Sequence, residues 1–306
     1  RIAPEYEGMV AYAPDAMSGL ALANTIQDAD ERAKLMDSLD DEAESMLSAD
    51  AAARESEDNG EDVPPAKVRH DFEIPNPPDL RLHVLNDHPL EEIFPLINPQ
   101  MLYVRHLGYK GRFADDLQAG EQAAIELHDS VRRVEDLVLA HEDIKANAVL
   151  KFFPANSDGQ RILIYGSEDQ NVTEEFYFGR QSQRDGLCLA DYLMPQRGGQ
   201  VDYVGMFLTS IGNGVRQLAE TWMAEGQFLN AHILQALALE SAEAFAELLH
   251  QQVRQMWGFG DPVGTTPQDL IRTQYRGKRF SFGYPACPRL EDQVQLFRLL
   301  EVPVNL

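Results

Sequence analysis

The sequence has few cysteines and no long apolar run. Only Cys188 and Cys287 occur among its 306 residues, which excludes a disulfide scaffold and indicates a reducing compartment. No segment approaches the roughly 18 consecutive apolar residues that cross a bilayer. The first residues lack the basic, apolar and small-residue order of a signal peptide. We therefore expect a cytoplasmic protein with no membrane partner. Because the chain begins with Arg, we expect it to be a piece of a longer one.

Basic residues are also scarce. Lys and Arg number 26 against 50 Asp and Glu, a formal net charge of −24. Such a surface repels phosphate backbones, so we expect no nucleic-acid partner. The acid is concentrated: Asp28 to Asp62 holds 14 acidic and 3 basic residues, no aromatic side chain, and is followed by Pro64-Pro65. This composition predicts a solvated, flexible linker over residues 28–68. General acidity of a salt-adapted protein is the alternative.

The linker divides the chain into three parts. Residues 1–27 are too short to fold alone, 28–68 form the linker, and 69–306 form a body of some 240 residues. The body opens with a Pro-rich stretch, 72–100, typical of an extended entry rather than a long helix. Apolar residues then recur at spacings of three and four from Ala124 to Val138, which predicts an amphipathic helix.

Short β-branched and aromatic runs follow that helix. Strands are predicted in "AVLKFFPA", "RILIYG", "EEFYFGR" and "VDYVGMFLTS", with a hairpin at Asp158-Gly159. Residues 214–257 contain no proline and little glycine, so we expect helix there. This mixture indicates an α+β fold.

The sequence lacks the common catalytic motifs. There is no Walker-type phosphate loop, no HExxH and no Gly-x-Ser-x-Gly elbow. "GFGDPVG" follows a helix and precedes no clear one, so it does not fit a dinucleotide-binding turn. Two cysteines 99 residues apart do not form a thiolate zinc site. Hydrolytic and metal chemistry therefore have little support, and we expect no catalytic side chain and no metal ligand.

One irregular segment, "RGKRFSFGYPACPRLEDQ" at 276–293, carries an unusual set of residues. Arg279 offers a planar fork for a carboxylate, and Gly283 lets a ligand lie close to the backbone. Tyr284 supplies a flat face for a ring or a cation. Pro285 and Pro288 stiffen the loop. Together these residues fit a small zwitterion with an attached ring. The alternative is a structural loop whose aromatic residues pack inward and whose Arg is solvated.

"RGKRFSFGYPACP" resembles the Arg-x-x-x-Gly-Tyr and Pro-Ala-Cys-Pro signature of the activation domain of cobalamin-dependent methionine synthase. "AEAFAELLHQQVRQMWGF", "FFPANSDGQRILIY", "LCLADYLMP" and "DYVGMFLTSIG" are similar to other segments of that domain, in the same order. Residues 1–27 resemble the end of the preceding cobalamin-binding domain. The resemblance implies a single domain with a twisted antiparallel β-sheet flanked by helices, which binds S-adenosylmethionine in a shallow surface groove.

The resemblance also implies an activity. The family supports reductive methylation of oxidised cob(II)alamin to methylcobalamin, with an electron from flavodoxin or a flavoprotein reductase and a methyl group from S-adenosylmethionine. The expected cofactors are S-adenosylmethionine and cobalamin, the latter bound mainly by the cobalamin-binding domain of the same enzyme, which is also an expected partner. The sequence lacks the cobalamin-ligating Asp-x-His-x-x-Gly motif, so this chain is not expected to make methionine alone.

Four expected site residues lie in 276–293, which we call the signature segment. By resemblance, Arg279 should bind the carboxylate of the ligand, and Ser281 and Gly283 should contact the ligand through backbone groups. Tyr284 should line the groove. The family continues past this segment with strands that add a Tyr, so we expect 69–306 to be C-terminally incomplete and to bind the ligand weakly.

Two more expected site residues lie elsewhere. Glu243 matches a ligand-contacting Glu, although Glu243, Glu247 and His250 share a helical face that is commonly just solvated. Asn98 stands where many members have Asp to receive the ligand's amino group; an amide oxygen accepts that hydrogen bond without the opposing charge.

The alternatives to this function are a stand-alone corrinoid reactivator for another methyltransferase and a non-catalytic docking module.

Overall fold

The computed structural model describes Val68 and residues 70–166, 171–181, 186–212 and 214–302. The expected cobalamin-domain segment 1–27 and nearly all of the expected linker 28–68 lie outside the described residues. One compact unit comprises Pro65–Phe178 and Leu187–Leu306, and it contains every element discussed below. Within the described part of the chain, no helix is long and apolar enough to cross a membrane.

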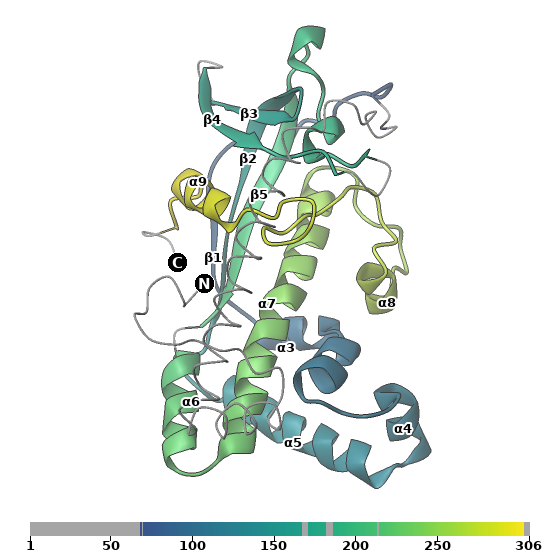
Figure 1. Ribbon diagram of the computed structural model, residues 1–306, viewed down its shortest axis with the longest axis vertical. Coiled ribbons are helices and arrows are strands. Elements are labelled where there is room, and N and C mark those ends of the chain that lie inside the picture. The colour runs from purple at the N-terminus through teal and green to yellow at the C-terminus, as the bar shows by residue number, and fades with distance from the viewer. Residues whose placement is uncertain (1–67, 69, 167–170, 182–185, 213, 303–306) are drawn as a thin grey trace, which may run out of the picture. The chain divides into compact units, whose positions relative to one another are not determined.

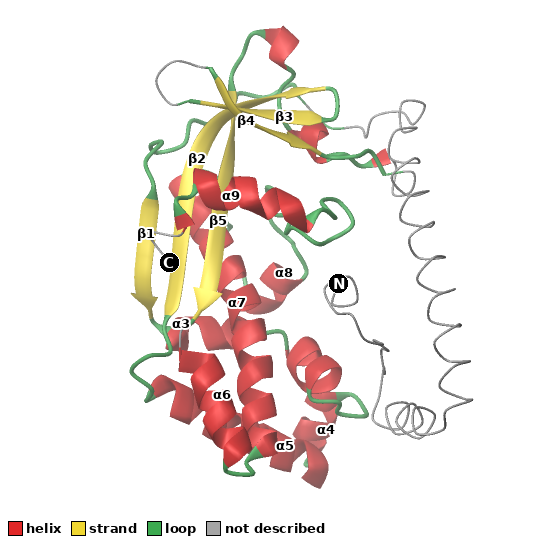
Figure 2. Cartoon of the chain, turned by 60° about the vertical axis from the view of Figure 1, so that its left-hand side comes forward, coloured by secondary structure: helices red, strands yellow, loops and turns green. Residues whose placement is uncertain are grey.

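The core of this unit is an antiparallel sheet (Figures 1 and 2). The 13-residue strand β2 is central: β1 pairs with its first half and β3 with its last residues, while β5 pairs along the other edge. Strand β4 pairs with β3. The strands are β1 (His83–His88), β2 (Ala146–Asp158), β3 (Arg161–Tyr165), β4 (Val172–Tyr177) and β5 (Asp202–Ile211).

Strand β2 is buried on both faces because its side chains alternate between two apolar clusters. Leu150 and Phe152 pack among the residues of the long helix α7 (Phe228–Met256), which runs beside β5 in Figure 1. Val149 and Phe153 point the other way, into a cluster completed by helix α9 (Gln293–Leu299) and the signature segment. The sheet therefore separates α7 from α9.

Several of the remaining helices contact α7, and the others pack against the sheet or against one another. They include two longer helices, α5 and α6, which contact α7, and several single turns. Their bounds are α3 (Leu90–Ile93), α4 (Phe113–Ala119), α5 (Gln122–Leu139), α6 (Gly214–Ala224) and α8 (Pro267–Ile271), with 3₁₀ turns η3 (Phe94–Leu96), η6 (Leu189–Tyr192), η7 (Gln196–Gly198) and η8 (Leu290–Asp292) and a π-helix η4 (Gln100–His106).

The structure confirms the α+β prediction and its main elements. Helix α5 buries Ala124, Val131, Val134 and Val138, as its spacing predicts. All four predicted strands form, and the hairpin turns at Gly159 with a positive φ of 61°. The helical region 214–257 is broken once, at Gly226, where φ is 77°. The sequence did not single out β1, because this edge strand lies in the Pro-rich entry and has only a weak alternation.

Candidate functional site

The signature segment is an irregular but internally bonded loop between α8 and α9. The Gly283 amide donates to the Cys287 carbonyl at 2.9 Å, and the Cys287 amide donates to the Tyr284 carbonyl at 2.9 Å. The Cys287 thiol donates to the Ser281 carbonyl at 2.9 Å, and burial raises the pKa of this thiol to about 11. The expectation that 276–293 is irregular is confirmed for 276–289 and wrong for 290–293, where η8 and the first residue of α9 form. Its conformation is held by its own backbone and by the buried Cys287.

Gly283 has a structural role in this loop. Its φ is 94°, and an added Cβ would lie 3.0 Å from Cδ2 of Leu290. Its amide is already used in the turn, so the ligand contact expected of this residue is left to its carbonyl.

We expect Gly283→Ala to lower the free energy of unfolding by more than Gly264→Ala. Both positions have a positive φ, which costs an L-residue about 1–2 kcal/mol, but a Cβ at Gly264 meets no atom within 4 Å. The measurement is urea unfolding of the two variants. Equal losses would show that Leu290 relaxes without cost and that only the backbone conformation matters.

The aromatic residues of the loop point in different directions. Phe282 packs inward, with ring centroids 6.2 Å from Phe176 and 6.3 Å from Phe178. Tyr284 is 58% exposed, whereas the Arg279 side chain is only 20% exposed. A purely structural loop would bury the Tyr and expose the Arg. Phe282 follows the structural alternative, but Tyr284 and Arg279 show the reverse: a flat ring faces solvent in the same loop as a mostly buried cation.

Arg279 faces two carboxylates of helix α7. Its Nη2 lies 3.2 Å from Oε2 of Glu247, and its Nη1 lies 3.8 Å from Oε2 of Glu243. Nη1 also donates to Oγ of Ser281 over 3.4 Å. Three of the expected site residues, Glu243, Arg279 and Ser281, are therefore brought together. Ser281 contributes its side chain to this contact, which the sequence-based interpretation did not anticipate. We call Arg279, Glu243, Glu247 and Ser281 the Arg279 cluster.

A buried network lies next to the Arg279 cluster. The guanidinium of Arg254, only 1% exposed, donates to both oxygens of Asp261, at 2.9 and 2.6 Å, and lies 3.8 Å from the ring centroid of Tyr275. The Tyr275 hydroxyl donates to Oε2 of Glu247 over 3.3 Å. Burial, and next the Glu247 charge, raise the pKa of Tyr275 to about 12. The network thus links the α7 face to the chain segment that precedes Arg279.

His250 completes the network as a neutral side chain. Its Nδ1 lies 2.7 Å from Nη1 of Arg254, so it accepts the hydrogen bond that this guanidinium donates. Burial, and next the positive charges of Arg254 and Arg279, lower the pKa of His250 from 6.5 to about 3, although the Asp261 charge opposes the shift.

We expect acid to destabilise the protein through His250. Its folded pKa lies below its unfolded one, so the unfolded state binds the proton and stability is lost as the pH falls below 6.5. The loss approaches about 1.4 kcal/mol per pH unit. Urea unfolding between pH 7 and 5 should show this slope, and His250→Gln should flatten it. The exposed His232 is the control: His232→Gln should keep the wild-type slope, and an unchanged slope in His250→Gln would contradict the assignment.

Asn98 lies in the short connection between η3 and η4. Its Oδ1 accepts the Gln100 amide at 3.0 Å, and its carbonyl accepts the amides of Met101 and Leu102 as η4 begins. No hydrogen bond between Asn98 and the other expected site residues is found within the described part of the chain. Its expected contact with the ligand's amino group stays a prediction.

Sequence reasoning missed three residues that organise the site: Glu247, Arg254 and Tyr275. A signal existed on α7, because Glu243, Glu247, His250 and Arg254 follow one another at spacings of four, three and four and share one helical face. Nothing in the spacing told which of them is buried. Asp261 and Tyr275 come from later segments and could not be paired with α7 from the sequence.

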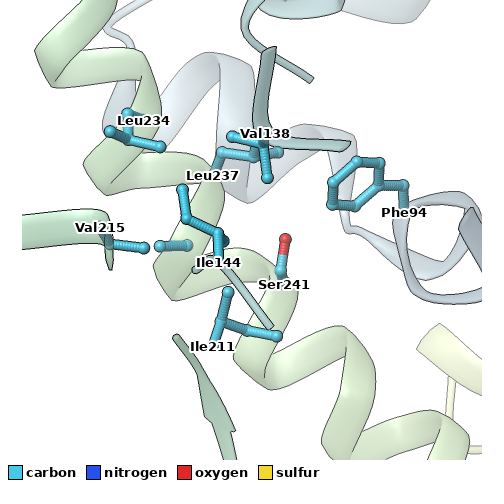
Figure 3. A pocket seen from close by; sticks show the side chains of 9 residues that line it. Phe94, Val138, Ile144, Ile211, Val215, Leu234, Leu237 and Ser241 are labelled. Atoms are coloured by element: carbon cyan, nitrogen blue, oxygen red, sulfur yellow. The ribbon is translucent and has the colours of Figure 1, made fainter. Parts of the chain in front are cut away.

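A small cavity lies between α7 and the residues Phe94, Val138, Ile144, Ile211 and Val215 (Figure 3). Its volume is about 10 Å³, room for one water at most. Eight of its nine lining residues are apolar, and only the Ser241 hydroxyl points into it. It contains none of the expected site residues. Within the described residues, no group of three or more His, Cys, Asp or Glu side chains is arranged to hold a metal.

The fold and the signature loop define a class: an α+β domain that carries a surface cluster of one guanidinium and two carboxylates and lacks a recognised catalytic motif. Residues 89–306 match the family described as "Vitamin B12 dependent methionine synthase, activation domain". The chain belongs to this family, which confirms the resemblance seen in the sequence.

Two relatives agree with this assignment. Methionine synthase of Mycobacterium tuberculosis is 28% identical over 334 aligned positions, which cover 98% of this chain and 27% of that protein. The chain therefore spans about a quarter of the length of this curated relative. The crystal structure of the MetH reactivation domain bound to AdoHcy superposes with a TM-score of 0.70 at 27% identity, covering 78% of this chain and 75% of that one.

Proposed function

We propose that this chain binds S-adenosylmethionine at the Arg279 cluster and supports reductive methylation of cob(II)alamin to methylcobalamin, as part of a cytoplasmic cobalamin-dependent methionine synthase. One observation carries the proposal. Arg279 and Glu243 present opposite charges 3.8 Å apart in a loose pair, and the loop that carries Arg279 also carries the exposed ring of Tyr284. An α-amino acid end carries a carboxylate and an ammonium at neighbouring positions, so it complements this pair.

Each residue then has a distinct role. The Nη1 group of Arg279 binds the carboxylate, and Glu243, whose side chain is 53% exposed, accepts from the ammonium group. Tyr284 stacks against the attached ring. Ser281 and Gly283 offer backbone groups, and Asn98 adds an amide acceptor. The likeness to a domain bound to AdoHcy supports this arrangement.

Methyl transfer from S-adenosylmethionine requires little catalytic chemistry from this chain. A sulfonium methyl group is already activated, so the protein needs only to bind and orient the ligand and requires no acid, base or nucleophile of its own. The cobalamin, held mainly by the cobalamin-binding domain of the same enzyme, supplies the metal that accepts the methyl group. The methyltransferase activity thus belongs to the whole enzyme, and this chain provides the methyl donor.

The electron donor we propose is flavodoxin or a flavoprotein reductase. An acidic donor needs local positive charge on an otherwise acidic protein. Arg276, Lys278 and Arg289 are exposed near the Arg279 loop, and Arg289 is paired to Asp292 at 3.3 Å. Reversal of the charge at Lys278 should lower the rate of reductive reactivation and its salt dependence if the donor docks there.

Calorimetric titration of the chain with S-adenosylmethionine and S-adenosylhomocysteine tests the binding step. We expect saturable binding of both ligands with one site per chain. Adenosine serves as the control, because it has the ring but not the zwitterion and should bind far more weakly. Absence of binding of either amino-acid ligand would overturn the proposal and favour a docking module.

A further inference from the structure

Glu247 is the buried acidic residue of the Arg279 cluster. Its side chain is 10% exposed, against 53% for Glu243. Its Oε2 contacts Arg279 and accepts from Tyr275, while its Oε1 is buried and has no hydrogen-bond partner among the described residues. The nearest cationic candidate to Oε1 is Nδ1 of His250, at 4.0 Å, and that ring is neutral.

The contact between Glu247 and Arg279 is incomplete. Nε and Nη2 share one edge of a guanidinium, and Arg254 uses this edge for two hydrogen bonds to Asp261. On Arg279 only Nη2 is engaged by Glu247, over 3.2 Å, and Nε is buried without a partner in the described part of the chain. Glu247 therefore holds Arg279 through Nη2 alone. Nη1 has only two long contacts, 3.4 Å to Ser281 and 3.8 Å to Glu243, which leaves it able to bind a ligand.

The charges of the cluster and its network do not cancel. Arg254 and Asp261 neutralise each other, and His250 and Tyr275 are uncharged at neutral pH. Arg279 stands against both Glu243 and Glu247, which leaves one uncompensated negative charge. The neighbouring Arg276 and Lys278 are exposed, so solvent and salt screen their charges. The excess negative charge of the cluster favours a cation nearby, and Glu247, the buried member, is screened less by solvent than the exposed Glu243.

We propose that Glu247 is a specificity-determining residue that makes the Arg279 cluster prefer a cationic sulfonium ligand over the neutral thioether. This inference rests on the proposed function. S-adenosylmethionine carries a net positive charge, whereas S-adenosylhomocysteine, which remains after the methyl group has left, carries none. Glu247 acts through its charge and not by contact with the ligand, because its free oxygen is buried. The preference favours exchange of spent ligand for fresh methyl donor.

The test is the ratio of the two dissociation constants. Calorimetry with S-adenosylmethionine and S-adenosylhomocysteine is performed on the wild-type chain, Glu247→Gln and Glu240→Gln. Glu240 is a matched control: it lies on α7, is similarly buried, and pairs with His106 at 2.8 Å rather than with Arg279. We expect the wild type to bind the sulfonium ligand more tightly, and Glu247→Gln to reduce this preference about five-fold. Glu240→Gln should keep the wild-type ratio.

The outcomes separate this inference from the proposed function. If the wild type binds neither ligand, both are wrong. If it binds both ligands equally tightly, or if Glu247→Gln weakens both by the same factor, Glu247 is only structural and this inference alone is wrong. Should Glu247→Gln fail to fold, equal affinity of the wild type for the two ligands would still overturn the inference, and Glu247→Asp, which keeps the charge, should retain the preference.

Discussion

Arg279→Ala should weaken binding of S-adenosylmethionine about 10- to 150-fold. The variant removes a charge-assisted contact to the ligand's carboxylate, which contributes about 1.5–3 kcal/mol. Glu247 binds the guanidinium through Nη2, so Nη1 is oriented before the ligand arrives and little side-chain entropy is lost on binding. Binding of adenosine, which has no carboxylate, should change far less. Calorimetry with both ligands measures the two effects.

Lys278→Ala is the matched control for this prediction. Lys278 precedes Arg279, carries the same charge and is exposed. If the loop binds its ligand through general positive charge, the two variants will lose similar affinity and the assigned carboxylate contact is wrong. Because Arg279→Ala leaves the buried Glu247 without its cationic partner, the unfolding curve of the variant should be recorded as well, so that loss of binding is not mistaken for loss of structure.

Arg254→Ala should be the most destabilising of the single substitutions considered. Removing one partner of a buried ion pair costs about 3–5 kcal/mol, because the other charge stays buried without compensation. Here Asp261, His250 and Tyr275 all lose the guanidinium that they share. Urea unfolding at pH 7 measures the loss.

Two further variants separate charge from volume. Arg254→Met keeps most of the side-chain volume, so a similar loss in this variant assigns the effect to the uncompensated Asp261. Arg112→Ala breaks an exposed pair with Asp115, at 3.1 Å, and should cost less than about 1 kcal/mol. If Arg254→Ala costs no more than Arg112→Ala, the network does not stabilise the fold as described.

Much of the fold could be predicted from local patterns. Period 3.6 located α5, β-branched and aromatic runs located four strands, and Asp158-Gly159 located their hairpin. These signals are strong because each element buries one face or two. Strand β1 was missed, since an edge strand with three exposed positions has little alternation. The break at Gly226 could not be placed, because a single glycine within a helical pattern is often tolerated.

Part of the candidate site was also open to prediction. The signature loop singled out Arg279, and helical spacing placed Glu243 beside Glu247 and His250. The order of burial was not predictable: Glu247, one turn further along α7, is the residue that the segment of Tyr275 and Arg279 covers. Which of the two carboxylates is buried depends on its distance from a segment some 30 positions away in the chain. Spacing along one helix does not predict that distance.

The sequence by itself determined the family, the mixed fold and the position of the signature loop, because these depend on residue type and on spacing within short segments. Tertiary structure alone decided that Arg279 lies between two carboxylates, that Arg254 and Asp261 are paired beside it, and that one negative charge is left over. The reason is physical: the charge balance and the burial of these residues depend on the contact between α7 and the signature segment. Neither segment, taken alone, determines that contact.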